Sequence, residues 1–228
     1  MPTILHIETA TEICSCALSS NSQVLLSREN SQGQSHATSL GVFVEEIMQF
    51  SRENDIKIDA VSVSSGPGSY TGLRIGVSEA KGLSYGLNIP LIAIPTHKIM
   101  AWMMKDKVEA DSLLCPMIDA RRMEVYSTIF DTDLNVIRAT SADIVDSNSY
   151  IHLLERHNIT FFGNGAGKCR EMITHPNASF ISGVKPHASA MVFLAEQAFS
   201  AGDFVDSAYF EPFYLKEFVA TVPKNKVI

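Results

Sequence analysis

The order of apolar segments along the chain constrains the fold most strongly. Three short extended segments come first and are separated by polar breaks; these strands are expected at residues 3–10, 13–19 and 23–28. Helices and strands then alternate, and they are expected at 36–54, 60–64, 71–86, 90–94 and 99–103. Ser35 is the expected N-cap of the first helix. This order predicts an α/β fold with a mixed sheet.

The second half of the chain resembles the first in outline. Leu5-His6-Ile7-Glu8 and Pro116-Met117-Ile118-Asp119 are each followed by a turn and another strand, although their sequence identity is negligible. On pattern alone an internal duplication stays open. If it holds, two α/β lobes meet at a cleft flanked by Glu8 and Asp119. The other expected elements of this half are strands at 113–119, 124–130, 135–137 and 159–162 and helices at 147–155 and 188–201.

The most unusual string is GPGSYTGLRIG at residues 66–76, between a predicted strand and a predicted helix. Glycines at such a place let backbone N–H groups approach an anion, and the helix N-terminus favours negative charge. They equally allow a tight turn in which the helix packs closely on the sheet. Glycine spacing alone does not separate a phosphate or carboxylate cradle from close packing.

The helix after this string contains Gly72, Gly76, Gly82 and Gly86, and each interior glycine costs about 1 kcal/mol relative to alanine. Close approach by another helix would offset that cost, and so would packing within the chain. The 36–54 helix carries apolar residues outside its main stripe. Together the two helices predict a dimerisation surface, with the candidate contacts Leu40, Phe43, Val44, Ile47, Gly72, Leu73, Gly76, Ala80 and Leu83.

Composition excludes several functional classes. The formal net charge is −7, and no basic run is longer than Arg121-Arg122, so tight direct RNA or DNA binding is disfavoured unless a partner supplies positive surface. The mean hydropathy of +0.09 and the absence of an 18-residue apolar run predict no membrane span. Four cysteines without CxxC spacing, and a start without a secretory signal, predict a cytoplasmic protein.

Motifs for metals and nucleophiles give negative results. No HExxH sequence occurs, and the residue four positions after His97 is Ala101, so no histidine pair lies on that predicted helix. The string at 163–169 is not a Walker A loop, because Phe162 and Cys169 replace its required glycine and Ser/Thr. Only Lys168 and Arg170 are adjacent to activate Cys169, which disfavours a catalytic thiol.

With these residues in hand, the chain resembles the TsaB (YeaZ) family over most of its length. The string at 66–76 is close to the family's GPGSFTGLRIG, residues 118–126 (IDARRMEVY) match its IDAR…EVY segment, and 212–216 (PFYLK) are similar to its PxYLR. The resemblance implies an ASKHA (actin-like/sugar kinase) fold with two RNase H-like lobes, each a mixed sheet flanked by helices. The expected lobes are 1–105 and 106–204, with the segment near 205–228 packing back on the first.

The resemblance also implies a binding role without catalytic activity of the isolated chain. Expected partners are the catalytic subunit TsaD and the ATPase TsaE, in the complex that makes N6-threonylcarbamoyladenosine at tRNA position 37. The chain is expected to act on tRNA only indirectly, through this complex. When the chain is alone, a homodimer is the alternative assembly. The family's first turn reads Asp-Thr-Ser, whereas this chain has Glu8-Thr9-Ala10. Weak or no ATP/Mg²⁺ binding is therefore expected at the vestigial nucleotide-type loops, Glu8, Thr9, Gly66, Gly68, Ser69 and Asp119.

Two other functions stay open as alternatives. A small-molecule kinase or ATPase of the same fold class would use Glu8 and Asp119 to place Mg²⁺. A glycoprotease-like metallopeptidase would need a pair of metal-binding histidines, which the sequence lacks. No structural metal and no membrane contact are expected.

Overall fold

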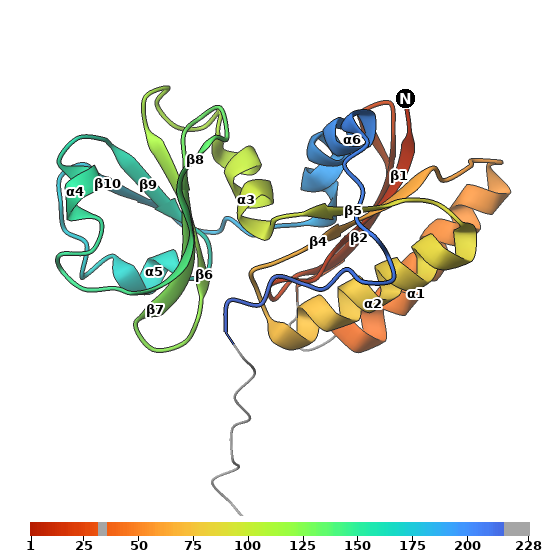
Figure 1. Cartoon of the computed structure of the whole chain (residues 1–228), viewed down its shortest axis with the longest axis horizontal. Coiled ribbons are helices and arrows are strands. Elements are labelled where there is room, and N and C mark those ends of the chain that lie inside the picture. Colours follow the sequence, from red (N-terminus) through yellow and green to blue (C-terminus); the bar gives the residue numbers. More distant parts are fainter. Residues whose placement is uncertain (32–35, 217–228) are drawn as a thin grey trace, which may run out of the picture.

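The structure is a computed structural model that describes residues 1–31 and 36–216. Two five-stranded sheets organise the chain into two lobes that lie side by side (Figure 1). The α/β architecture predicted from the order of apolar segments is confirmed.

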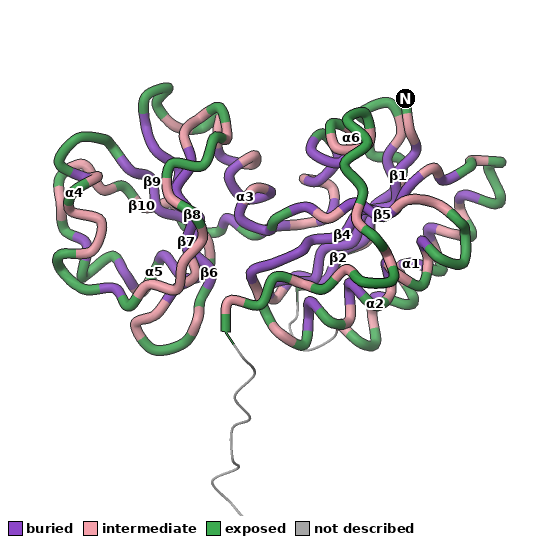
Figure 2. The backbone as a smooth tube through the Cα atoms, viewed as in Figure 1, coloured by how far each residue is buried: buried purple, intermediate pink, exposed green. Residues whose placement is uncertain are grey.

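The first sheet has the strand order β3-β2-β1-β4-β5. Its first three strands form an antiparallel meander, and β4 and β5 extend it in parallel with β1. Every residue of the central strand β1 is buried, because helices cover both faces of the sheet there (Figure 2). The strands are β1 (Thr3–Glu8), β2 (Cys14–Ser20), β3 (Gln23–Asn30), β4 (Ala60–Ser64) and β5 (Leu91–Ile94).

The second sheet repeats this topology. Its order is β10-β9-β6-β7-β8, so β6, β7 and β8 form the antiparallel meander, and β9 and β10 extend it in parallel. The strands are β6 (Leu113–Asp119), β7 (Glu124–Phe130), β8 (Val136–Ile144), β9 (Ile159–Phe162) and β10 (Ala178–Ile181). The duplication that the sequence left open is therefore present at the level of the fold.

Two long helices cover one face of the first sheet: α1 (His36–Glu53) and α2 (Tyr70–Leu87). The spacing of Leu40, Val44 and Ile47 puts them on one side of α1, where they are buried against the sheet. Ser69 caps α2, because its Oγ accepts a hydrogen bond from the backbone N–H of Gly72 at 3.3 Å. The predicted N-cap of α1, Ser35, lies outside the described residues.

Two other helical segments pack on the sheet of the opposite half of the chain. α3 (Thr96–Met104), assigned to the first lobe, packs Met100, Ala101 and Met104 into the core of the second sheet. The 188–201 segment, assigned to the second lobe, forms the 3₁₀ helix η1 (Ala188–Met191) and α6 (Val192–Ala201), whose apolar residues pack on the first sheet. Each half of the chain thus supplies a helix to the other half's sheet.

The segment 205–216, here called the C-terminal strap, returns to the first lobe. Val205 pairs with Leu91 at the edge of β5, and Lys81 Nζ on α2 donates hydrogen bonds to the carbonyls of Ala208 (3.2 Å) and Phe210 (3.0 Å). The strap then runs along α2 towards the second lobe (Figure 1). The rest of the predicted segment, 217–228, lies outside the described residues.

Element boundaries differ from the sequence expectations mainly in the second lobe. β8 is longer than the predicted 135–137, and β10 was not predicted at all, because neither segment alternates clearly between apolar and polar residues. The predicted 147–155 helix is reduced to α4 (Ile151–Leu154), and a short helix α5 (Ala166–Cys169) follows the glycine turn. None of the helices within 36–216 combines the length and the hydrophobicity that a membrane crossing requires.

Candidate functional site

The glycine string packs against the turn that follows β1. Ser69 N donates to Ala10 O at 2.7 Å, and Thr9 Oγ1 donates to Gly72 O at 2.8 Å. A Cβ at Gly68 would lie 2.3 Å from Ala10 O, and one at Gly72 would lie 2.2 Å from Thr9 O. Both distances are too short for a real contact, so these two positions accept only glycine. Of the two interpretations of the string, close packing is what the structure shows.

Glu8 lies at the C-terminal end of β1 and is fully buried. Its Oε1 accepts a hydrogen bond from Ala10 N at 2.6 Å, whereas Oε2 has no partner among the described residues. Burial raises the pKa of Glu8 to about 7, since a buried carboxylate loses its hydration. The group is therefore partly neutral at physiological pH.

A Glu8→Gln variant should show how much this buried acid lowers the free energy of unfolding. The pKa of Glu8 is higher in the folded state than in the unfolded state. Between pH 4.5 and 7 the folded state therefore binds more protons than the unfolded state. As the pH rises through that range, Glu8 lowers the free energy of unfolding. The shift corresponds to about 3 kcal/mol at pH 8. Gln removes this penalty, and urea unfolding should show E8Q more stable than the original chain at pH 8 but not at pH 5.

Asp119 lies at the C-terminal end of β6 and is exposed, but its charge is compensated. Lys168 Nζ forms an ion pair with Asp119 Oδ1 and also donates to the carbonyls of Arg122 (2.6 Å) and Glu124 (2.7 Å). Asp119 Oδ1 also accepts a hydrogen bond from Arg121 N at 3.2 Å. The second predicted Mg²⁺ ligand is therefore already engaged by an ammonium group.

A side-chain bridge joins the two lobes beside these acids, and sequence reasoning missed it. Asn164 accepts from Asp119 N at 3.0 Å and donates to Glu12 Oε2 at 3.1 Å, and Lys185 pairs with Glu12 Oε1 at 3.2 Å. These residues are far apart in the sequence, and no spacing pattern links them. Only the fold brings them together.

The C-terminal strap lies over the start of the glycine string. Phe213 N donates to Ser65 O at 2.7 Å, and a Cβ on Gly66, whose φ is +98°, would lie 2.9 Å from Phe213 O. The ring of Tyr214 lies 4.9 Å from that of Tyr70, and Lys216 forms an ion pair with Glu124 of the second lobe. The strap thus covers the glycine string and contacts both lobes.

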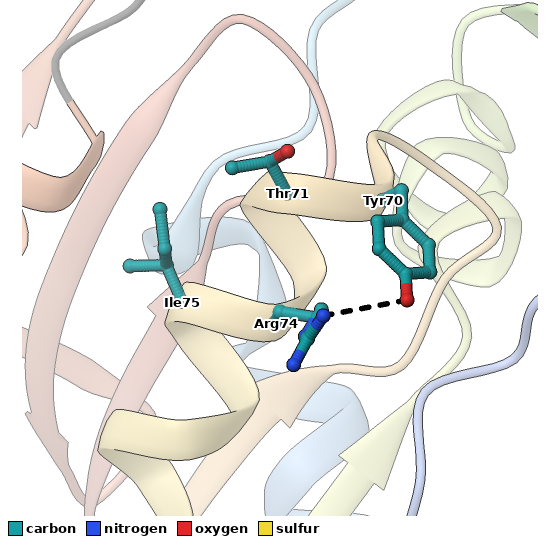
Figure 3. Close-up of a pocket in the computed structure, with 4 residues that line it drawn as sticks. All are labelled: Tyr70, Thr71, Arg74 and Ile75. Atoms are coloured by element: carbon teal, nitrogen blue, oxygen red, sulfur yellow. Dashed lines mark hydrogen bonds between the residues drawn. The ribbon is translucent and has the colours of Figure 1, made fainter. Parts of the chain in front are cut away.

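A hollow opens beside the first turn of α2 (Figure 3). Tyr70, Thr71, Arg74 and Ile75 line it, and Arg74 Nη1 donates to the hydroxyl of Tyr70 at 3.4 Å. The Arg74 guanidinium also lies 5.5 Å from the centre of the Tyr70 ring. All four residues belong to the glycine string at 66–76, but nothing in the sequence indicated the hollow itself.

Most of the predicted contact residues of the dimerisation surface are buried within the single chain. Seven of the nine are buried within the chain's own first lobe, and Phe43 and Leu83 are half-buried; the seven are Leu40, Val44, Ile47, Gly72, Leu73, Gly76 and Ala80. Gly76 is fitted to Thr9, whose Oγ1 would lie 2.2 Å from an added Cβ. These side chains pack inward because they form the apolar stripes of α1 and α2, so the outer faces of these helices carry other residues.

The two side chains considered for metal binding and nucleophilic chemistry are both buried. His97 Nδ1 shares a hydrogen bond with Thr128 Oγ1 at 2.7 Å, and burial lowers the pKa of His97 to about 3. Burial raises the pKa of the Cys169 thiol, which keeps it protonated. Among residues 1–31 and 36–216, no three His, Cys, Asp or Glu side chains gather closely enough to hold a metal ion.

Comparison with known families gives consistent results. A family model described as TsaD, tRNA N6-adenosine threonylcarbamoyltransferase, matches residues 23–223. The tRNA threonylcarbamoyladenosine biosynthesis protein TsaB of Escherichia coli strain K12 is 32% identical over 228 residues, covering 95% of this chain and 96% of that protein. The sequence motifs and the family comparisons therefore agree.

Solved structures confirm the predicted fold class. A Pseudomonas aeruginosa protein described as similar to peptidase YEAZ aligns with a TM-score of 0.81 at 26% identity, covering 95% of this chain and all of that one. The activator of 2-hydroxyisocaproyl-CoA dehydratase from Clostridium difficile aligns with a TM-score of 0.50 at 10% identity, covering 88% of this chain and 97% of that one. The second likeness concerns the fold alone, which is the two-lobed ASKHA architecture.

Proposed function

This chain belongs to the TsaB family of tRNA threonylcarbamoyladenosine biosynthesis proteins, and on that premise we propose that it is the non-catalytic partner of a TsaD-type threonylcarbamoyltransferase. It pairs with the catalytic subunit, supports that subunit's active conformation, and presents with it a docking site for the TsaE ATPase. The catalytic subunit supplies most of the affinity for tRNA. When alone, this chain uses the same surface to form a homodimer.

Surface glycines on α1 and α2 carry the proposal. An added Cβ on Gly41, Gly82 or Gly86 would meet nothing within 4 Å, so the chain's own fold does not require glycine there. Each costs about 1 kcal/mol of helix stability relative to alanine. Close approach by a helix from another subunit offsets such a cost, since glycines let two backbones come near each other. Val42, which follows Gly41 on α1 and is 54% exposed, adds apolar area to the surface of that helix.

The chemistry of the two acids at the ends of β1 and β6 supports a role without catalysis. Glu8 is buried and partly protonated, and Asp119 is paired with Lys168, so the two acids suited to place Mg²⁺ are engaged otherwise. The C-terminal strap also packs on the start of the glycine string, where Phe213 O lies against Gly66. Because these acids and the glycine string are engaged in contacts within the chain, the two lobes suit a scaffold better than a kinase.

A Gly82→Leu variant tests the surface without disturbing the core. Leucine is the better helix former by about 1 kcal/mol, and the space around Gly82 is open, so the isolated variant should melt at the same or a higher temperature. Its side chain would hold an approaching helix away. We expect its affinity for the TsaD homologue of the same cell to fall at least tenfold, measured by isothermal titration calorimetry.

Gly167→Leu is the matched control. Gly167 also lies in a helix with open space around it, but in α5 of the second lobe. This variant should bind the TsaD homologue as the original chain does. Equal affinities for both variants would place the partner on another surface, and no binding by the original chain would exclude the proposed pairing altogether.

A further inference from the structure

The hairpin between β6 and β7 exposes two adjacent arginines in an unusual backbone conformation. Arg121 has φ +71° and Arg122 has φ +49°, a region that favours glycine and asparagine. The hairpin is closed by hydrogen bonds from Ala120 N to Glu124 O and from Glu124 N to Arg121 O, both 3.1 Å. Both arginine side chains are exposed, and neither guanidinium has a partner among the described residues. The closed hairpin thus presents two adjacent, exposed arginine side chains.

Charges around the hairpin leave these arginines uncompensated. Two acidic side chains lie at the ends of the hairpin, and a third, Glu12, is joined to it through Asn164. Each of the three is paired with a lysine: Asp119 with Lys168, Glu124 with Lys216, and Glu12 with Lys185. These pairs are neutral, so the two arginines add two positive charges in a chain whose net charge is −7. A local surplus of this sign attracts an anion.

The hairpin lies where the two lobes meet. Asp119, at its base, is joined through Asn164 to Glu12 of the first lobe, and Glu124, at its other end, is bound by Lys216 of the C-terminal strap. In Figure 1 the loop between β6 and β7 lies on the same, lower side as the N-terminal end of α2. A large ligand that spans both lobes would therefore touch the hairpin.

We propose that Arg121 and Arg122 contact the phosphodiester backbone of the RNA that the complex modifies. This inference rests on the proposed function, under which the assembled complex acts on a tRNA, a large polyanion. Guanidinium groups bind phosphate oxygens in a bidentate manner, and such contacts position an RNA without reading its sequence. Two contacts do not give tight binding alone, which agrees with the acidic composition of the chain.

The test variant is Arg121→Asn combined with Arg122→Gly. Asparagine and glycine tolerate positive φ, so the double variant should fold at least as well as the original chain while losing both charges. An unmodified tRNA transcript is titrated into the complex of this chain with its TsaD homologue at several salt concentrations. Each phosphate contact contributes about 0.7 to 0.9 to the slope of log K against log salt. The double variant should lower the slope by about 1.5 and the affinity at least tenfold at low salt.

Two controls make the result specific. Arg121→Lys with Arg122→Lys keeps the charges and should keep most of the slope. Arg156→Asn removes an exposed charge elsewhere on the second lobe and should change the slope by less than one contact. An unchanged slope in the Asn/Gly variant would overturn the proposal, as would a loss of binding to the ATPase without a change in slope, which would assign the hairpin to an acidic protein surface. Complex formation is checked first by size exclusion, so a failure to pair counts against the proposed function instead.

Discussion

A Gly72→Ala variant is expected to lose at least about 3 kcal/mol of unfolding free energy, although alanine is the better helix former. The new Cβ would lie 2.2 Å from the carbonyl oxygen of Thr9, and the Thr9 hydroxyl is hydrogen-bonded to Gly72 O. Neither backbone segment can move away without breaking the packing of α2 on the turn after β1. Urea denaturation followed by circular dichroism measures the loss.

Gly82→Ala is the matched control within the same helix. Its Cβ would meet nothing within 4 Å, so this variant should gain about 1 kcal/mol. If both variants unfolded at the same urea concentration, close packing would not be the reason for glycine at position 72. The comparison also shows why a bulky residue at Gly76 does not probe partner binding: Thr9 Oγ1 would lie 2.2 Å from its Cβ, and the fold itself would suffer.

Acidification is expected to destabilise the protein by several kcal/mol. Burial lowers the pKa of both His6 and His97 to about 3, whereas the unfolded value is 6.5. The folded state therefore binds fewer protons than the unfolded state, so stability is full above pH 6.5 and is lost as the pH falls towards 3. At pH 4 each histidine removes about 3 kcal/mol. Protonation of Glu8 acts in the opposite sense between pH 7 and 4.5 and offsets part of the loss.

A His97→Asn variant isolates one of these contributions. Asparagine can keep a hydrogen bond to Thr128 but does not titrate, so the loss of unfolding free energy between pH 6.5 and 4 should shrink by about 3 kcal/mol. The exposed His157→Asn variant should follow the original chain. Urea unfolding at a series of pH values gives both curves, and parallel curves for H97N and the original chain would show that His97 is not the acid-sensitive group.

Local sequence patterns predicted most of the elements, because the apolar residues of strands and helices recur with a period that the sequence shows directly. The strands at 113–119, 124–130 and 159–162 have the predicted bounds. The exchange of helices between lobes could not be predicted, since the periodicity of α6 shows that it has an apolar face but not which sheet that face covers. Family resemblance supplied the two-lobed ASKHA arrangement, which periodicity alone left open.

The candidate site was predicted less well, for a physical reason. Four glycines of the second helix look alike in the sequence, yet Gly72 and Gly76 accommodate Thr9, whereas Gly82 and Gly86 face open space. Only the position of the turn after β1 separates the two pairs. Contacts such as Glu12 with Asn164 join residues of different lobes, and no local spacing rule reports on them.

The exchanged helices also set an order for assembly during synthesis. The second lobe draws its sheet and its covering helix from residues 96–181, so all its parts leave the ribosome together. The first lobe needs η1, α6 and the strap, which are translated roughly a hundred residues after its last strand, β5. Until they emerge, of the described helices on this face only α3, through Ile99, packs against its sheet. The lobe that is translated first is therefore the lobe that is completed last.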